Sequence, residues 1–183
     1  MDVDPPAQPP AALVFEASVD GRRIGTHRFE FEGDPREELR VHSLAQFTYK
    51  VLGVTLYRYR HEARETWRKG CVVALDSDTD DNGKKVTVRA ALGDATLPRT
   101  GCTRAYAYWR PEWLIPPLLN PQTGVADELS ITDVGSASEA KHKRLTGDAI
   151  RIDLRYGADG DWLQLESLTP EKRVLKYRRI AAQ

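Results

Sequence analysis

Apolar and polar residues alternate along most of the chain, which is the pattern of β-strands with one face on a core. The alternation begins in "ALVFEASV" (12–19) and returns in "RRIGTHRFEFE" (22–32), with Asp20-Gly21 between them. Asp-Gly between two alternating segments favours a tight hairpin, because both central residues of such a turn need positive φ. These two segments are therefore expected to pair as antiparallel strands.

The same signals continue to residue 92. Apolar side chains of one parity run from Leu39 to Val51, Gly53 ends that segment, and Lys69-Gly70 and Asn82-Gly83 mark two further turns. Residues 12–92 thus predict six antiparallel strands in up-and-down order. Three more strands are expected in "DAIRIDLRY" (148–156), "DWLQLES" (161–167) and "KRVLKYRRI" (172–180).

The segment between the two strand-rich regions, "CTRAYAYWRPEWLIPPLLNPQTG" (102–124), is apolar and not strand-like. Pro111 suits the first turn of a helix, and Pro116-Pro117 must end that helix by about Ile115. The polar segment 135–147 is expected to be a loop. The predicted fold is mainly β: a strongly curved antiparallel sheet of about nine to ten strands, forming an open or closed barrel with a short helical lid.

The stretch "VTLYRYRHEARETW" (54–67) carries rings on one face and charges on both. The face with the rings carries Tyr57, Tyr59, His61 and Trp67, and the opposite face carries Arg58, Arg60 and Arg64. The arginines can pair with carboxylates of neighbouring strands while their methylene groups cover apolar surface. The rings can either fill a core or line the wall of a cavity, and the pattern leaves both interpretations open.

His61 raises the question of catalysis. A neighbouring carboxylate could orient it as a general base, but Glu62 projects to the opposite face, and a histidine satisfied by packing is the alternative. The chain has no nucleophile elbow, Walker loop, dinucleotide fingerprint or His-Glu-x-x-His motif. The acidic run from Asp76 to Asp81 resembles a calcium loop but lacks the closing glutamate. No metal or cofactor is predicted.

Composition narrows the classes of function. The chain of 183 residues has 27 basic and 27 acidic residues, so its charge gives no reason to expect nucleic-acid binding. No apolar run approaches the roughly 18 residues of a membrane span. Residues 1–10, with four prolines, are expected to be a flexible tail without the pattern of a signal peptide, and residues 11–183 a single domain.

Cys71 and Cys102 are the two cysteines of the chain. Two buried thiols that pack as small apolar groups are one interpretation. A single disulfide in an exported protein is the other. The spacing alone does not choose between them.

Three stretches together resemble an uncharacterised bacterial family, a domain of unknown function whose members usually carry an export signal. They lie within residues 47–85, 107–124 and 150–167, and the most specific marks are Tyr108, Trp109, Pro111 and the segment 120–124. The resemblance implies a curved sheet similar to the periplasmic lipoprotein-carrier fold, with a hollow for acyl chains. It also implies a periplasmic or otherwise exported protein, with a cytoplasmic location as the alternative, and with export a disulfide between Cys71 and Cys102.

The leading hypothesis is a non-enzymatic carrier of a hydrophobic small molecule or lipid in the cell envelope, with an envelope protein as a further expected partner. The expected ligand-binding residues are Tyr57, Tyr59, His61, Trp67, Tyr106, Tyr108, Trp109 and Trp113. One alternative is an isomerase, cyclase or hydrolase that uses His61 and a tyrosine on an apolar substrate. The other is a structural or interaction protein that uses its arginine-rich face and the segment 135–147.

Overall fold

The computed structural model describes residues 11–135 and 141–182, so the predicted Pro-rich tail lies outside the described residues. Eleven strands form one antiparallel sheet in the order β10-β11-β12-β13-β14-β1-β2-β3-β4-β5-β6. The long strands are β1 (Ala12–Val19), β2 (Arg22–Gly33), β3 (Glu38–Val51), β4 (Val54–Arg68), β5 (Cys71–Asp81) and β6 (Lys84–Ala91). The shorter ones are β10 (Ser130–Asp133), β11 (Lys141–Thr146), β12 (Arg151–Tyr156), β13 (Trp162–Leu168) and β14 (Val174–Ile180).

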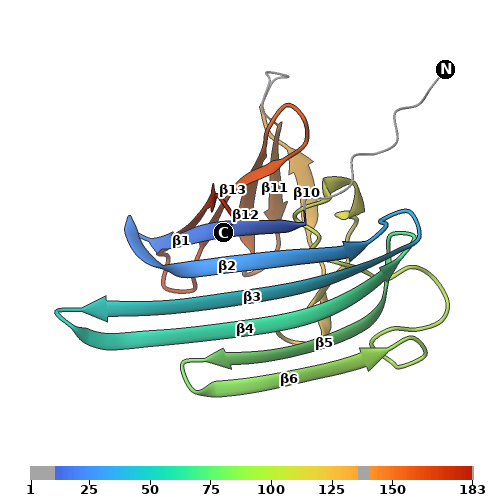
Figure 1. The fold of residues 1–183 in the computed structure, drawn as a ribbon, viewed down its shortest axis with the longest axis horizontal. Coiled ribbons are helices and arrows are strands. Elements are labelled where there is room, and N and C mark those ends of the chain that lie inside the picture. The colour runs from blue at the N-terminus through green and yellow to red at the C-terminus, as the bar shows by residue number, and fades with distance from the viewer. Residues whose placement is uncertain (1–10, 136–140, 183) are drawn as a thin grey trace.

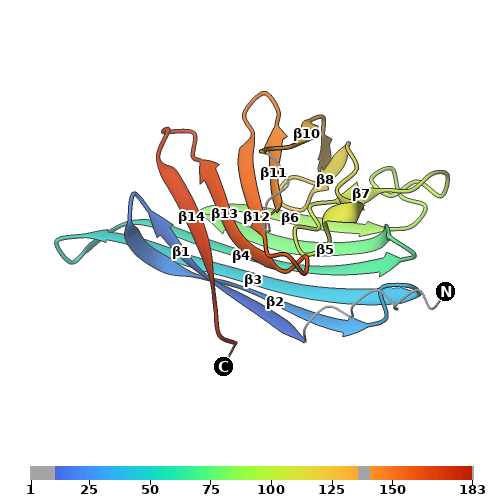
Figure 2. The same ribbon diagram turned by 90° about the horizontal axis from the view of Figure 1, so that it is seen from above.

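The sheet folds back on itself (Figures 1 and 2). Strands β1 to β6 form one long, gently curved layer, and β10 to β14 cross it steeply as a second layer. β14 pairs with β1 and joins the two layers, whereas the edge strands β6 and β10 do not pair with each other. The expected mainly β, antiparallel fold is confirmed, and the described barrel is open rather than closed.

The six consecutive strands predicted for residues 12–92 are confirmed as β1 to β6. The tight turns at Asp20-Gly21, Lys69-Gly70 and Asn82-Gly83 have positive φ at both residues, as the hairpin signals require. Burial alternates along the second half of β4, where His61, Ala63, Glu65 and Trp67 are buried. Strand parity therefore identified which face of β4 points to the core.

The expected helical lid is wrong. The middle segment contains one turn of 3₁₀ helix (Pro111–Trp113) and a small sheet of β7 (Arg104–Ala105), β8 (Leu118–Asn120) and β9 (Val125–Asp127). Proline at both ends of the helical stretch leaves too few residues for an α-helix. We call residues 102–124 the plug segment, because it packs between the two layers at one end of the sheet (Figure 2).

A disulfide ties the plug segment to the sheet. It joins Cys71, the first residue of β5, to Cys102, and their Cα atoms are 5.1 Å apart. No helix among the described residues is long and apolar enough to cross a membrane.

Two hydrophobic clusters fill most of the space between the layers. The first gathers side chains from β1, β2, β3 and the strands β11 to β14, around Phe15 and Trp162. The second packs β3 to β6 against the plug segment, around Trp67 and Trp113. The plugged end of the molecule is therefore closed by side chains rather than by a lid over a hollow.

The segment 135–147 was expected to be a loop, but residues 141–146 form β11, while 136–140 lie outside the described residues. Its partners are polar: Arg144 and His142 both contact Asp153 on β12, at 2.8 and 2.7 Å. Charge pairing across the strands replaces the apolar alternation that marks other strands.

Candidate functional site

The inner face of β4 changes character along its length. Trp67, at the plugged end, has no exposed surface, and His61 and Glu65 are buried. Tyr59 is only half-buried, and Tyr57, nearest the β3–β4 turn, is exposed. We call the end of the sheet that carries the β1–β2, β3–β4 and β5–β6 turns the hairpin end. The candidate rings thus become accessible toward the hairpin end.

Tyr59 has aromatic neighbours on two sides. Its ring stacks on Phe47 of β3, with centroids 5.4 Å apart and planes inclined by 16°. Burial raises the pKa of Tyr59 well above its usual range, and the nearby tyrosines Tyr57 and Tyr108 raise it further. Tyr108 comes from the plug segment, so the two layers bring these phenols together although they are far apart in the sequence.

The plug segment presents the other predicted rings in the same region. Tyr106, Tyr108 and Trp109 are half-buried and pack against the first hydrophobic cluster. The hydroxyl of Tyr106 donates a hydrogen bond to Asp127 at 2.6 Å. Within the described residues, no hydrogen bond involves the hydroxyl of Tyr59 or Tyr108. We call Tyr59, Tyr106, Tyr108 and Trp109 the concave aromatic group.

The remaining predicted tryptophans belong to the plugged end. Trp67 and Trp113 are stacked with ring centroids 5.0 Å apart, and Trp109 meets Trp67 edge to face at 6.2 Å. Both stacked rings are buried. The structure therefore separates the eight predicted residues. Trp67 and Trp113 lie in the second cluster, and the concave aromatic group borders the first, with Trp109 packed against both. Of the remaining two, His61 is buried and Tyr57 is exposed.

Histidines supply polar atoms to this interior. His61 Nδ1 lies 2.7 Å from the hydroxyl of Thr79 on β5, and burial lowers the pKa of His61 to about 4. His27 Nδ1 lies 3.1 Å from the hydroxyl of Tyr177, while its buried Nε2 has no partner. Sequence reasoning missed His27, although it shares its parity on β2 with Phe29 and Phe31. That shared parity was the available signal.

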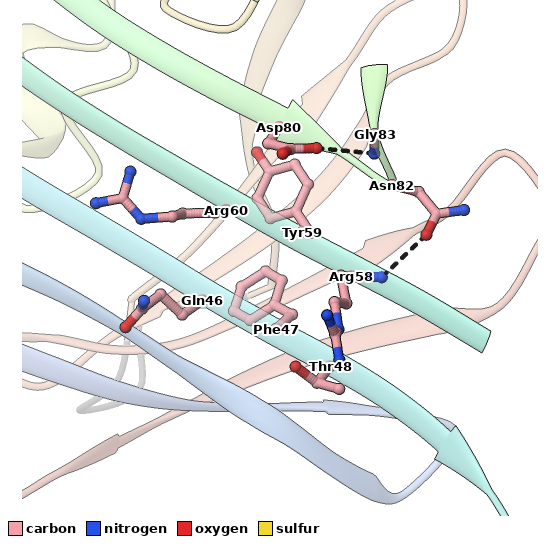
Figure 3. A pocket seen from close by; sticks show the side chains of 9 residues that line it. All are labelled: Gln46, Phe47, Thr48, Arg58, Tyr59, Arg60, Asp80, Asn82 and Gly83. Atoms are coloured by element: carbon pink, nitrogen blue, oxygen red, sulfur yellow. Dashed lines mark hydrogen bonds between the residues drawn. The ribbon is translucent and has the colours of Figure 1, made fainter. Parts of the chain in front are cut away.

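The outer face of the sheet carries a different surface. An open depression of about 340 Å³ lies over β3, β4 and the β5–β6 turn (Figure 3). Its lining residues are Gln46, Phe47, Thr48, Arg58, Tyr59, Arg60, Asp80, Asn82 and Gly83, so Tyr59 borders both this depression and the concave aromatic group. Along the same face, Glu62 accepts bonds from Arg60 and Arg64 and contacts His42 at 2.9 Å. These exposed ion pairs contribute about 0 to 1 kcal/mol each to stability.

Glu65 is a buried acid next to the tryptophans of the plugged end. It accepts a hydrogen bond from Trp67 Nε1 at 2.8 Å. Burial raises the pKa of Glu65 to about 7, against the smaller opposing effect of that hydrogen bond. The carboxyl group is therefore protonated in the folded protein at mildly acidic pH.

Replacing Glu65 by glutamine tests this arrangement. The folded state holds the proton more tightly than the unfolded state, so the resulting stabilisation is complete below about pH 4.5 and is lost as the pH rises toward 7. Between pH 4.5 and pH 8, the free energy of unfolding of Glu65→Gln should gain about 3 kcal/mol relative to the wild type. Urea unfolding at both pH values measures this, and a difference that is independent of pH would contradict it.

A family model described as "Domain of unknown function (DUF6134)" matches residues 15–180. A crystal structure of a beta-barrel-like protein of the domain of unknown function DUF1849, from Brucella abortus, superposes with a TM-score of 0.58. It shares 10% sequence identity, and the match covers 92% of this chain and 94% of that one. This likeness shows the fold alone. No curated protein matches the chain.

Proposed function

The chain belongs to the DUF6134 family, a domain of unknown function, and we propose that it binds an apolar small molecule or a lipid acyl chain without catalysing a reaction. The ligand lies against the concave aromatic group, on the side that faces the hairpin end. The observation that carries this proposal is the half-exposed pair Tyr59 and Tyr108, whose hydroxyls make no hydrogen bond within the described residues.

The chemistry of the group suits such a ligand. Concave sites for small molecules are mainly apolar, with a few polar groups that fix orientation. The rings of Tyr59, Tyr108 and Trp109 offer apolar contact, and the two free hydroxyls can bind a carboxyl or ester group. Because the two hydrophobic clusters occupy most of the interior, the ligand is a single chain or a small ring system rather than a multi-chain lipid.

The site of action that we propose is the cell envelope. A disulfide such as Cys71–Cys102 persists in oxidising compartments and is rare where thiols are kept reduced. An envelope protein that delivers or receives the ligand is the expected partner.

The enzyme alternative depends on His61 and receives less support. Its pKa of about 4 makes the imidazole neutral near pH 7 but also a weak base. Burial is the only cause of this shift, and the Nδ1 partner is the hydroxyl of Thr79 rather than a carboxylate. We therefore propose that His61 bridges β4 and β5 as a structural residue.

Binding of dodecanoic acid tests the proposal. The ring of Trp162 lies 5.3 Å from that of Tyr108, so ligand binding should change the tryptophan fluorescence. Tyr59→Ser removes a ring from the site and should weaken binding about tenfold or more, the loss expected for one buried apolar side chain. Gln46→Ala alters only the outer depression and should leave the affinity unchanged.

Two outcomes would count against the proposal. The protein would bind no such ligand if dodecanoic acid caused no saturable change in fluorescence and native mass spectra of gently purified protein showed no retained lipid. An equal loss of affinity in Tyr59→Ser and Gln46→Ala would place the binding on the outer face instead.

A further inference from the structure

The turn between β3 and β4 exposes apolar side chains at the hairpin end. Leu52 is 99% exposed, Val54 61% and Leu56 56%. This hairpin projects beyond its neighbours in both ribbon views (Figures 1 and 2). We call residues 51–56 the apolar tip. Single exposed apolar residues are common on protein surfaces, but three together on a projecting turn indicate a binding surface.

The residue at the head of the tip is costly for the fold. Leu52 has φ +49° and Gly53 φ +80°, the same geometry as the turns at Asp20-Gly21, Lys69-Gly70 and Asn82-Gly83. Those three turns place a polar residue at the first position. Leucine rarely adopts this left-handed conformation, whereas asparagine and aspartate tolerate it. The turn geometry therefore does not favour a leucine at position 52. The side chain of Leu52 is also fully exposed, so it contributes nothing to the packing of the core.

Positive charges surround the base of the tip. Lys50 is exposed, and Arg22 donates a hydrogen bond to the carbonyl of Lys50 at 2.7 Å. Arg22 and Arg173 lie against the ring of Tyr49, each 5.5 Å from its centroid. We call Arg22, Lys50 and Arg173 the basic collar.

Three acidic residues lie nearby. Asp20 lies 3.9 Å from Arg173, and Glu171 also raises the pKa of Arg173. Asp81 accepts a hydrogen bond from the hydroxyl of Tyr57 and keeps its negative charge. Within the described residues, neither Arg22 nor Lys50 has an ion pair. Among the described residues, Arg22 and Lys50 are therefore the cations of the collar that no carboxylate pairs with, and they lie at the base of the apolar tip.

We propose that the apolar tip inserts into the surface of a phospholipid bilayer that contains anionic lipids, with the basic collar at the level of the phosphate groups. Tyr49 and Lys50 precede Leu52 by two to three residues, which corresponds to about 7 to 10 Å along a strand. Peripheral segments bury their apolar side chains about 5 to 10 Å into the boundary between headgroups and acyl chains. The spacing of tip and collar matches that depth. This inference is independent of ligand binding at the concave aromatic group.

Vesicle sedimentation tests the inference with three proteins. The probes are vesicles of phosphatidylcholine alone and vesicles with one part phosphatidylglycerol to three parts phosphatidylcholine. The wild type should sediment with the anionic vesicles, less with the neutral ones, and less again at high salt, because salt screens the collar. Leu52→Asn should weaken binding to anionic vesicles about tenfold or more, since one buried leucine side chain is lost.

Controls separate the tip from general effects of substitution. Leu52→Asn restores the residue type that this turn geometry favours, so circular dichroism and urea unfolding should show an intact fold. Leu163→Asn, which changes a 38% exposed leucine at the start of β13, should bind vesicles like the wild type.

The inference is overturned by any of four results. The wild type could fail to bind either vesicle, the two leucine variants could bind equally well, or binding could be insensitive to anionic lipid and to salt. A dimer that depends on Leu52, detected by analytical ultracentrifugation in the absence of vesicle binding, would also overturn it, since the tip would then contact a second copy of the chain.

Discussion

Replacing Trp67 by alanine is expected to lower the free energy of unfolding by about 4 kcal/mol, as large-to-small substitutions of fully buried aromatic residues do. Trp67 has no exposed surface and is stacked on Trp113 of the plug segment. Its Nε1 also donates a hydrogen bond to Glu65. The substitution therefore opens a cavity and leaves a buried carboxyl group without its partner, and both effects destabilise the fold.

Urea unfolding followed by circular dichroism measures this loss. Trp67→Phe keeps a ring against Trp113 and should lose less than half as much, which separates the cavity from the loss of aromatic packing. A loss below about 1 kcal/mol for Trp67→Ala would mean that neighbouring side chains fill the space left by the ring with little loss of folding free energy. In that case the plug segment would not be held against β4 by this cluster.

Removing the disulfide is expected to lower the free energy of unfolding by about 3 to 4 kcal/mol, from the loop-closure entropy of the unfolded chain. Cys71 and Cys102 are 31 residues apart in the sequence, and they join the start of β5 to the plug segment. In the unfolded chain, the cross-link reduces the number of conformations open to the segment that contains β5, β6 and the loop after them.

The double variant Cys71→Ser/Cys102→Ser, compared with the wild type in urea, measures this contribution. Adding a reductant should destabilise the wild type by a similar amount and leave the double variant unchanged. Free thiols detected by maleimide labelling of the unfolded, unreduced wild type would show that the bond is absent. Equal stability of the two proteins would show that it contributes nothing.

The long strands could be read from the sequence because two independent signals agree there. Alternation of apolar residues gives the strands, and dipeptides such as Asp20-Gly21 and Asn82-Gly83 give the turns between them. The inner parity of β4 followed directly, since a strand can turn only one set of alternate residues toward a core.

The short strands gave no such signal. β7, β8 and β9 have two or three residues each, which is too short for alternation to be recognised. β11 is held largely by polar pairs such as Arg144 with Asp153, and Leu145 is its buried apolar residue. Tertiary pairing, rather than local pattern, decides these segments.

The candidate site was predicted only in part. Parity placed Tyr59 and His61 on the inner face, but it could not tell that Trp67 would be sealed in a cluster while Tyr59 stays half-exposed. That difference depends on where the plug segment packs, which no local pattern encodes. From the sequence, Gly53 was recognised only as the end of a strand segment, and the exposure of the apolar tip depends on how far the hairpin projects beyond its neighbours.

We propose that the half-exposed rings between the two layers hold an apolar chain, and a crystal structure of the protein with dodecanoic acid tests this proposal. We expect density for the acyl chain in contact with the rings of Tyr59 and Tyr108, with its carboxyl group hydrogen-bonded to one of their hydroxyls. Density confined to the outer face beside Gln46 and Arg58, or saturating ligand with no density between the layers, would contradict it.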